Sequence, residues 1–435
     1  MDVAVTAMFG VSDQAGQRLV TPGALRGPAS LTRAQVNSRA TALGADGAAW
    51  QEHLADSPRF AGLAGQLLIE GQRTNAVRNA RGEGAVAGIL GGGGALPTNW
   101  TQSRSPELTL TILGTVTVNG LPGVRLRVSG TTPAGGGFAM IDFESPTASA
   151  AGPGQSFSGS VFWRLSGGSA AGLTLTRLQV TGRSATGAEV AGNAFGGPGA
   201  ALTATLSRPV VTATLTADAT LARVNHRAAW TFAGGTAVDM TVDLCAPQLE
   251  AGAFASSPIL PPAGAPTAST RGGDLITAPL ASLGIGGTGA CTILMSCVLP
   301  LGTPALPGTF GFFSIDNGTA NTRFTLRTDV VNGILGERLL AGAGAVSPST
   351  FTYTPGVPIR LGAVIVGDGS MRLLAAGGTI QGVTGGATGG LTTLRVGATA
   401  PGGVALFGEA IAFRVLPYVL PDAALPGAVA ALPGG

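Results

Sequence analysis

From about residue 100 onward, apolar and polar residues alternate with a period of two, and glycine clusters interrupt the alternation at short intervals. Such alternation places one face of a strand on a core and the other in water, as in antiparallel sheets packed face to face. Glycine clusters favour turns over crossover helices. The four clearest runs are Leu108/Leu110/Ile112, Val124/Leu126/Val128, Met240/Val242/Leu244 and Phe324/Leu326/Thr328. The sequence therefore predicts an all-β fold.

Two breaks divide the chain, the GGGG run at 91–94 and the proline-rich segment ILPPAGAPTAST at 259–270. A chain of 435 residues is long enough for two to four domains. We expect two antiparallel β-sandwich (jelly-roll) domains, 96–262 and 263–435, the second with a short C-terminal tail. A small N-terminal attachment region, 1–95, precedes them. Helical propensity is confined to short segments at 31–42, 48–55 and 422–431.

An uncharged stretch from residue 275 to 315 resembles a membrane span in crude hydropathy. Gly, Pro, Ser and Thr interrupt it every few residues, whereas a spanning helix needs roughly 20 mostly apolar residues in one run. Two buried strands joined by an apolar loop are the expected structure, without membrane insertion.

The composition excludes several chemistries. All 25 basic residues are Arg, so a P-loop lysine, a Schiff-base lysine and a kinase-type lysine are impossible. There are two His residues, and Cys245, Cys291 and Cys297 lack the spacing of a zinc site. A net charge of +3 does not indicate nucleic-acid binding. The N-terminus MDVAVTAMFG has neither a basic region nor a continuous apolar region, which predicts no signal peptide.

The segment GQLLIEGQRTN (65–75) is similar to the GLLIEGQRTN signature common in bacteriophage and prophage fibre or spike proteins. In that family a threonine-arginine-alanine stretch and a proline-arginine-phenylalanine precede the signature. Here SLTRA (30–34) and DSPRF (56–60) stand in the same order. The resemblance covers roughly residues 28 to 425.

The resemblance also implies the two folds. In such proteins a tryptophan opens a jelly roll of the carbohydrate-binding-module type, and PTNW (97–100) stands at that place. A closing QLExGxFATSYIPT-like segment and a TRxAD motif correspond here to PQLEAGAFASSPILP (247–261) and STRGGD (269–274). Pro258 replaces the usual aromatic residue. The segments that follow resemble a concanavalin A-like or laminin-G-like sandwich. Such resemblances specify a fold better than a ligand.

Four residues of the linker signature, Glu70, Gly71, Arg73 and Asn75, are candidate structural residues. Glu70 and Arg73 bracket Gly71 beside the apolar run 67–69, which we expect to be a buried strand. The pair would contact neighbouring segments and fix the angle between the N-terminal region and the sandwich. An exposed pair of this kind contributes only about 0 to 1 kcal/mol. Bracing is favoured over ligand contact.

Trp100 is the candidate glycan-binding residue, together with Asn99 and Gln102. Sugar C–H surfaces stack on aromatic faces while their hydroxyls bond to nearby polar groups. Core packing is the alternative for Trp100 and the favoured role of Trp163, which follows Val161 and Phe162 in a strand-like run.

The loop residues Asp316, Asn317 and Asp368 are calcium candidates in the second sandwich. Asx residues before glycine are also the usual residues of tight turns, and turns are favoured here. No other cofactor is expected.

The sequence as a whole indicates a non-enzymatic virion protein, a tail fibre or head spike of a tailed phage, prophage or gene transfer agent. It would attach the particle to host-surface polysaccharide as a homo-oligomer beside other virion proteins, with avidity from multiple copies. Assembly in the host cytoplasm agrees with the cysteine count. A structural spike or adaptor without glycan affinity is the alternative. A glycan depolymerase is less favoured, because Asp142 with Glu144, or Glu409 alone, make no recognisable carboxylate pair.

Overall fold

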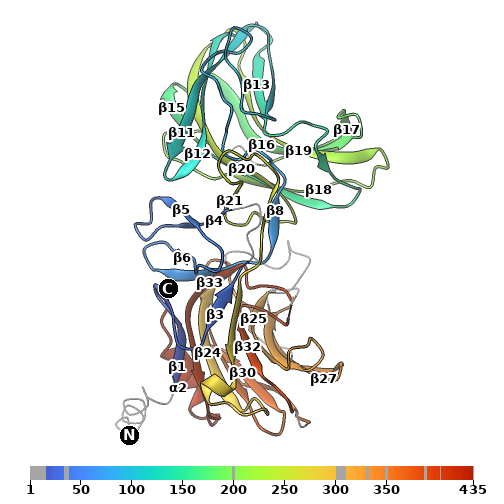
Figure 1. Cartoon of the computed structure of the whole chain (residues 1–435). Helices are drawn as coiled ribbons and strands as arrows, with labels where there is room; N and C mark the ends of the chain where they lie inside the picture. The colour runs from blue at the N-terminus through green and yellow to red at the C-terminus, as the bar shows by residue number, and fades with distance from the viewer. Residues whose placement is uncertain are drawn as a thin grey trace.

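The computed structural model describes residues 16–33, 39–197, 201–299, 310–329, 333–347, 351–386, 389–401 and 403–434. Two β-sandwiches lie one above the other, with short strands between them (Figure 1). The ladders that build both sandwiches are antiparallel. The predicted all-β, antiparallel fold is therefore confirmed.

The first sandwich packs two sheets against each other. In the first sheet the order is β10 (Thr101–Arg104), β13 (Gly137–Asp142), β19 (Leu221–Phe232), β16 (Leu173–Ser184) and β17 (Glu189–Gly196), with β14 (Ser149–Ala150) beside β19. In the second it is β18 (Val210–Thr214), β15 (Ser156–Gly168), β20 (Ala237–Ala251), β12 (Leu121–Thr131), β11 (Leu108–Val118) and β9 (Gly88–Ile89).

The C-terminal sandwich also has two sheets. One runs β2 (Ala24–Leu25), β1 (Gln17–Thr21), β33 (Gly408–Leu416), β24 (Cys291–Val298), β29 (Pro358–Ile365), β30 (Met371–Ala375) and β31 (Gln381–Val383). In this sheet β7 (Gln66–Ile69) pairs with β33, and β6 (Phe60–Ala61) pairs with β7. The other runs β28 (Ala343–Ser347), β27 (Ile334–Leu340), β26 (Arg323–Thr328), β25 (Gly311–Asp316), β32 (Thr393–Val396), β23 (Leu275–Pro279) and β3 (Ser30–Thr32).

Short strands connect the sandwiches: β21 (Ile259–Leu260) with β4 (Arg39–Leu43) and β5 (Trp50–His53), and β22 (Ser269–Arg271) with β8 (Arg73–Asn75). Within the described ranges the helical elements are the 3-10 turn η1 (Ala281–Leu283) and helix α2 (Leu425–Ala430), which lies within the predicted segment 422–431. The helix expected at 48–55 is wrong, and so is the one expected at 31–42 at both of its described ends, while residues 34–38 lie outside the described part. Strands β3, β4 and β5 lie in these segments, because pairing with distant strands overrides weak local propensity.

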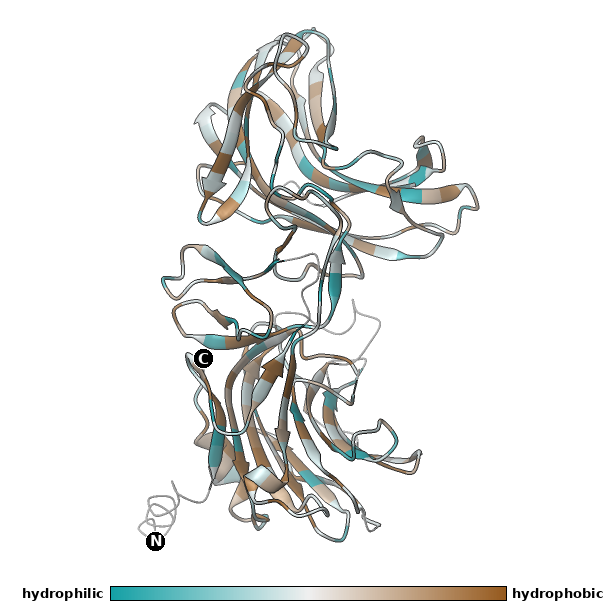
Figure 2. Ribbon diagram, in the orientation of Figure 1, coloured by the Kyte–Doolittle hydropathy of each residue, from teal (hydrophilic) through white to brown (hydrophobic). Residues whose placement is uncertain are grey.

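Period-two alternation places the cores where the sequence predicted them. Val124, Leu126 and Val128 are fully buried in the first sandwich, and Phe324 and Leu326 are buried in the second. Figure 2 shows hydrophobic and hydrophilic residues interleaved along the strands. The uncharged stretch 275–315 supplies β23, β24 and β25 to the second core, and its residues 300–309 lie outside the described part. No helix in the described ranges has the length and apolar character needed to cross a membrane.

The described residues before position 95 do not form a region of their own. Strands β1 and β7 pair with β33, and β3 pairs with β23, so these strands belong to the C-terminal sandwich. Strand β9 pairs with β11 of the first sandwich. The structure thus differs from the expected separate region 1–95, because N-terminal strands extend sheets whose edges would otherwise be open.

Candidate functional site

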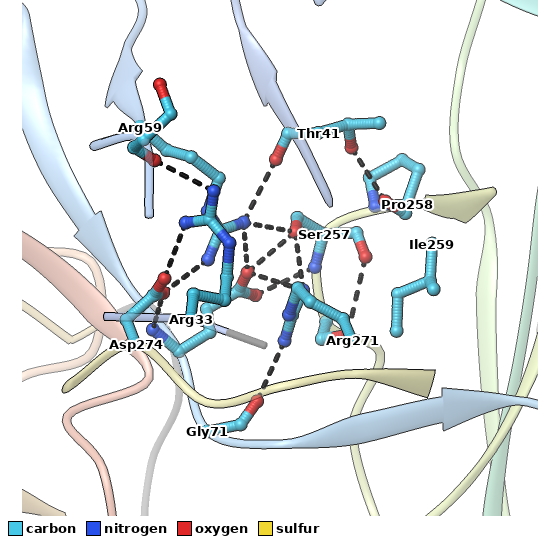
Figure 3. Close-up of polar contacts among 12 residues, drawn as sticks. Arg33, Thr41, Arg59, Gly71, Ser257, Pro258, Ile259, Arg271 and Asp274 are labelled. Atoms are coloured by element: carbon cyan, nitrogen blue, oxygen red, sulfur yellow. Dashed lines mark hydrogen bonds and ion pairs between the residues drawn. The ribbon is translucent and has the colours of Figure 1, made fainter. Parts of the chain in front are cut away.

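The motif segments 56–60, 65–75, 247–261 and 269–274 and the described residues 30–33 of the first motif meet between the two sandwiches (Figures 1 and 3). Short ladders bring them together. There β8 pairs with β22, β7 lies on β33, and β3 lies on β23. At the centre lies a buried ionic cluster, which we define as Arg33, Arg59, Glu70, Ser257, Arg271 and Asp274.

Glu70 is one of two carboxylates in the ionic cluster and is 5 % exposed. Its Oε2 accepts hydrogen bonds from Arg59 Nη1 at 2.7 Å and Arg271 Nη1 at 2.8 Å. Ser257 donates to the same carboxylate through its backbone N–H and its hydroxyl. Burial opposes ionisation of Glu70, but the Arg271 and Arg59 guanidiniums and the Ser257 bonds lower its pKa to about 2. Glu70 is therefore ionised at all ordinary pH values.

Asp274 is the second carboxylate. Arg33 Nη1 donates to its Oδ1 at 2.7 Å, and Arg59 Nη2 donates to its Oδ2 at 2.5 Å. The backbone N–H of Glu70 also donates to Oδ2, at 2.8 Å. Arg59 thus bridges both carboxylates, with no exposed side-chain surface.

Three guanidinium groups face two carboxylates in the ionic cluster. Other Nη–H groups of these arginines donate to backbone carbonyls, namely those of Thr41, Leu54, Ser57 and Gly71. The Nε atoms of all three arginines are buried without a hydrogen-bond partner among the described residues. A buried ion pair contributes modestly when compared with well-packed apolar residues. Removing one partner, however, leaves an uncompensated charge and costs about 3 to 5 kcal/mol. The ionic cluster therefore makes the junction between the sandwiches intolerant of single changes.

Glu70 and Arg73 both contact neighbouring segments, as the sequence predicted, but Glu70 is buried and no hydrogen bond or ion pair joins the two side chains. The Arg73 guanidinium lies over the rings of Phe254, at 4.2 Å, and Phe407, at 5.0 Å. Arg73 Nη1 also donates to the carbonyl of Ala251. Phe254 follows the last strand of the first sandwich and Phe407 precedes β33 of the second, so Arg73 contacts an aromatic residue from each.

Gly71 and Asn75 complete the linker signature. A Cβ atom on Gly71 would lie 2.5 Å from Cζ of Phe407, so only glycine fits without moving that ring. Asn75 is fully buried, and its Nδ2 donates to the carbonyls of Pro247 and Ile259 while its Oδ1 accepts from the N–H groups of Val77 and Leu249. Both residues act on the junction and neither faces solvent as a ligand group.

A cavity of about 150 Å³ adjoins the ionic cluster, and Glu70, Glu409, Phe254 and Phe407 are among its lining residues. Burial and the nearby Glu70 carboxylate raise the pKa of Glu409.

Trp100 is 5 % exposed, so the prediction that its ring faces solvent for sugar stacking is wrong, and the alternative, core packing, describes it. Its Nε1 donates to the carbonyl of Asn79 at 3.0 Å, and its ring packs edge-on against Phe143 at 5.0 Å. Asn99 has a left-handed φ of 73°, which is a turn conformation, and Gln102 is half-buried in β10. The entrance to the first sandwich is therefore a packed corner.

The other tryptophans are not exposed either. Trp163 and Trp230 are fully buried in the first core, as predicted for Trp163. Trp50 is half-buried and packs edge-on against Phe162. No tryptophan of this chain presents an open face.

The calcium candidates form turns and an ion pair in place of a cage. Asp316 accepts from Arg395 Nε at 2.6 Å, which neutralises its charge. Asn317 accepts from the N–H and hydroxyl of Thr319, and Asp368 accepts from those of Ser370. Asp316 belongs to the sheet of β25, whereas Asp368 follows β29 in the opposite sheet. Among the described residues no group of three His, Cys, Asp or Glu could hold a metal ion.

The carboxylates weighed for depolymerase chemistry have separate partners. Glu144 pairs with Arg78, and Asp142 accepts from Asn225. Glu409 lies in the other sandwich.

Sequence reasoning placed the motif segments but did not single out Arg33, Arg59, Ser257, Arg271 or Asp274. A signal was available, since only 11% of the residues are charged and four of these five are charged residues inside the motif segments. Charged residues beside apolar runs in such a chain indicate buried pairing.

No family model and no curated protein matches the chain. Solved structures that it resembles include a carbohydrate-binding module of a Ruminococcus gnavus sialidase, 19% identical, with 34% of this chain and 85% of that chain covered and a TM-score of 0.28. A carbohydrate-binding module of the β-sandwich superfamily is 14% identical over 55% of this chain and 99% of that one, with a TM-score of 0.29. The tripod from the baseplate of bacteriophage Tuc2009 is 10% identical over 83% and 98%, with a TM-score of 0.26. These likenesses are too weak to carry an argument about function.

Proposed function

We propose that this protein is a virion structural subunit, a tail fibre or head spike of a tailed phage, prophage or gene transfer agent, that attaches the particle to host-surface glycans. One observation carries the proposal. The segments similar to the fibre and spike linker signature are the segments that build the buried ionic cluster between the sandwiches. A junction of this kind suits a rod-like appendage that holds one sandwich away from the particle.

Other virion proteins and further copies of this chain are the proposed partners, and no catalytic step is assigned to it. Weak individual contacts to polysaccharide would gain strength from the number of copies on one particle. Calcium is not required in this proposal, so chelation with EDTA should leave binding unchanged.

A purely structural spike or adaptor is the second candidate. The burial of Trp100, Trp163 and Trp230 favours it, because it removes the usual aromatic platform for sugars from the first sandwich.

The test begins with particles purified from the producing strain. Immunogold labelling and quantitative mass spectrometry should find the chain on particles, in a fixed ratio to the major capsid protein. Absence from purified particles would refute the proposal.

Binding of the purified, multivalently displayed chain to host-envelope polysaccharides then separates the candidates. Saturable binding without released oligosaccharides supports attachment, whereas released fragments identify a depolymerase. Presence on particles without binding leaves the structural spike.

A further inference from the structure

The outer face of the β15-β20-β12-β11 sheet carries three arginines and two aspartates, which we call the arginine face: Arg125, Arg127, Arg164, Asp239 and Asp243. Arg125 donates hydrogen bonds from Nε and Nη2 to the Asp243 carboxylate, at 2.7 and 3.0 Å. Arg164 Nε donates to the same aspartate at 2.8 Å. Arg127 donates from Nε and Nη2 to the Asp239 carboxylate at 2.7 and 2.8 Å.

Strand register explains why these side chains share one face. Val124, Leu126 and Val128 point into the core, so Arg125 and Arg127 point outward. Arg125 lies opposite Asp243, and Asp243 lies opposite Arg164 on the next strand. By the same alternation, outward hydroxyl residues surround the charges, namely Thr109, Thr111, Ser129 and Thr241.

The arginine face has an excess of positive charge, since three guanidiniums meet two carboxylates and leave a net charge of +1. Nη1 of Arg125, Nη1 of Arg127 and both Nη atoms of Arg164 have no protein partner within the described ranges. These side chains are 36, 46 and 31 % exposed, respectively. A guanidinium whose Nε side is fixed by a carboxylate presents its remaining N–H groups in a defined direction.

We infer that the arginine face binds an anionic polysaccharide. The inference rests on the proposed attachment function and specifies its ligand class and site. Free guanidinium N–H groups match carboxylate or sulfate groups, and the neighbouring hydroxyls match sugar hydroxyls. A neutral glycan would instead need an aromatic stacking surface, and the tryptophans of this sandwich are buried.

The test uses the full chain, displayed multivalently, against polygalacturonate and against the same polymer after reduction of its carboxyl groups. We expect binding to the charged polymer only, weakened by added salt. Arg127→Gln should weaken binding roughly fivefold, and Asp239→Asn should strengthen it by a similar factor, because an anionic polymer is attracted by a positive charge on this face and repelled by a negative one. Both variants break the same exposed ion pair, so opposite effects can come only from charge.

Arg372→Gln is the matched control, because it removes an arginine that is paired with Asp422 on the C-terminal sandwich. Equal binding of the reduced polymer, changes in the same direction for both variants, or an equal loss in the control would overturn the inference. So would a change in oligomeric state by Arg127→Gln without any effect on polysaccharide binding, which would identify a contact between copies.

The inference and the proposed function fail differently. If the chain is on particles but does not bind the charged polymer, only the inference is refuted. If the chain is absent from particles, the attachment function fails whatever the polymer experiment gives.

Discussion

The buried ionic cluster and the arginine face are built from the same pairs, guanidinium with carboxylate, and differ in what surrounds them. In the ionic cluster the Arg59 side chain has no exposed surface, and it donates hydrogen bonds to both the Glu70 and the Asp274 carboxylates. On the arginine face the pairs lie between neighbouring strands and nearly half of the Arg127 side chain is in solvent. The same chemistry therefore supports structure in one region and leaves donors free for a ligand in the other.

The energetic consequence differs accordingly. Solvent-exposed pairs contribute little, because water screens the charges and long side chains lose freedom when they are fixed. Buried pairs are costly to break, because the remaining partner keeps its charge without water around it. Changes in the ionic cluster should therefore alter stability, and changes at the exposed Arg127–Asp239 pair of the arginine face should alter binding.

Arg59→Ala should have the largest effect. It leaves both Glu70 and Asp274 short of a partner and should lower the free energy of unfolding by about 3 to 5 kcal/mol. Urea unfolding should be followed by tryptophan fluorescence and by circular dichroism. All four tryptophans lie in the first sandwich or against it, so separation of the two curves would report independent unfolding of the sandwiches. Arg372→Gln removes an ion pair of the C-terminal sandwich and serves as the control. If Arg59→Ala lowered the free energy of unfolding no more than Arg372→Gln does, the ionic cluster would not hold the two sandwiches together.

Glu70→Gln should destabilise the fold at neutral pH and much less in acid. The folded pKa of Glu70 is lowered from 4.5 to about 2, so its ionised form stabilises the fold above pH 4.5, and this stabilisation is lost as pH falls toward 2. The gap between the natural protein and Glu70→Gln should shrink by about 2 kcal/mol between about pH 6 and pH 3. Urea midpoints across this range measure the gap. A gap that stays constant with pH would mean that Glu70 is not ionised in the fold.

Gly71→Ala probes the junction without changing charge. The new Cβ would lie 2.5 Å from the Phe407 ring, which would have to move off the Arg73 guanidinium. Forced repacking of this kind costs about 1 to 3 kcal/mol. Chemical unfolding measures the cost, with Gly427→Ala as the control because its added Cβ would meet no atom within 4 Å beyond its chain neighbours and the backbone of its own helix. Equal stability of the two variants would show that the ring relocates freely.

The sandwiches were predictable because their cores follow a local rule. Leu108, Leu110 and Ile112 alternate with threonines along one strand, and a period of two is enough to assign their face. The partners of Glu70 were not predictable in this way. Arg59 and Arg271 lie 11 and 201 residues away in the sequence, and no periodicity relates them.

Trp100 illustrates the opposite error. Its polar neighbours in the sequence suggested exposure, but the left-handed backbone at Asn99 turns the chain and Trp100 enters the core against Phe143. The prediction of a separate N-terminal region differs from the structure for a related reason. A glycine run marked a loop, whereas β1 and β7 pair with β33, more than 300 residues later in the sequence. Long-range pairing leaves no signal in a short window.

Arg127→Gln should have the smallest effect on stability. Its ion pair with Asp239 lies in solvent on the arginine face, so the urea midpoint should stay where it is in the natural protein while polysaccharide binding falls. Arg59→Ala should give the reverse, a large fall in stability with binding retained under conditions where the first sandwich stays folded. Both variants can be measured on the same preparations by unfolding and by biosensor. If Arg127→Gln destabilised the fold as strongly as Arg59→Ala, the arginine face would be part of the structural framework and the contrast between the two regions would be lost.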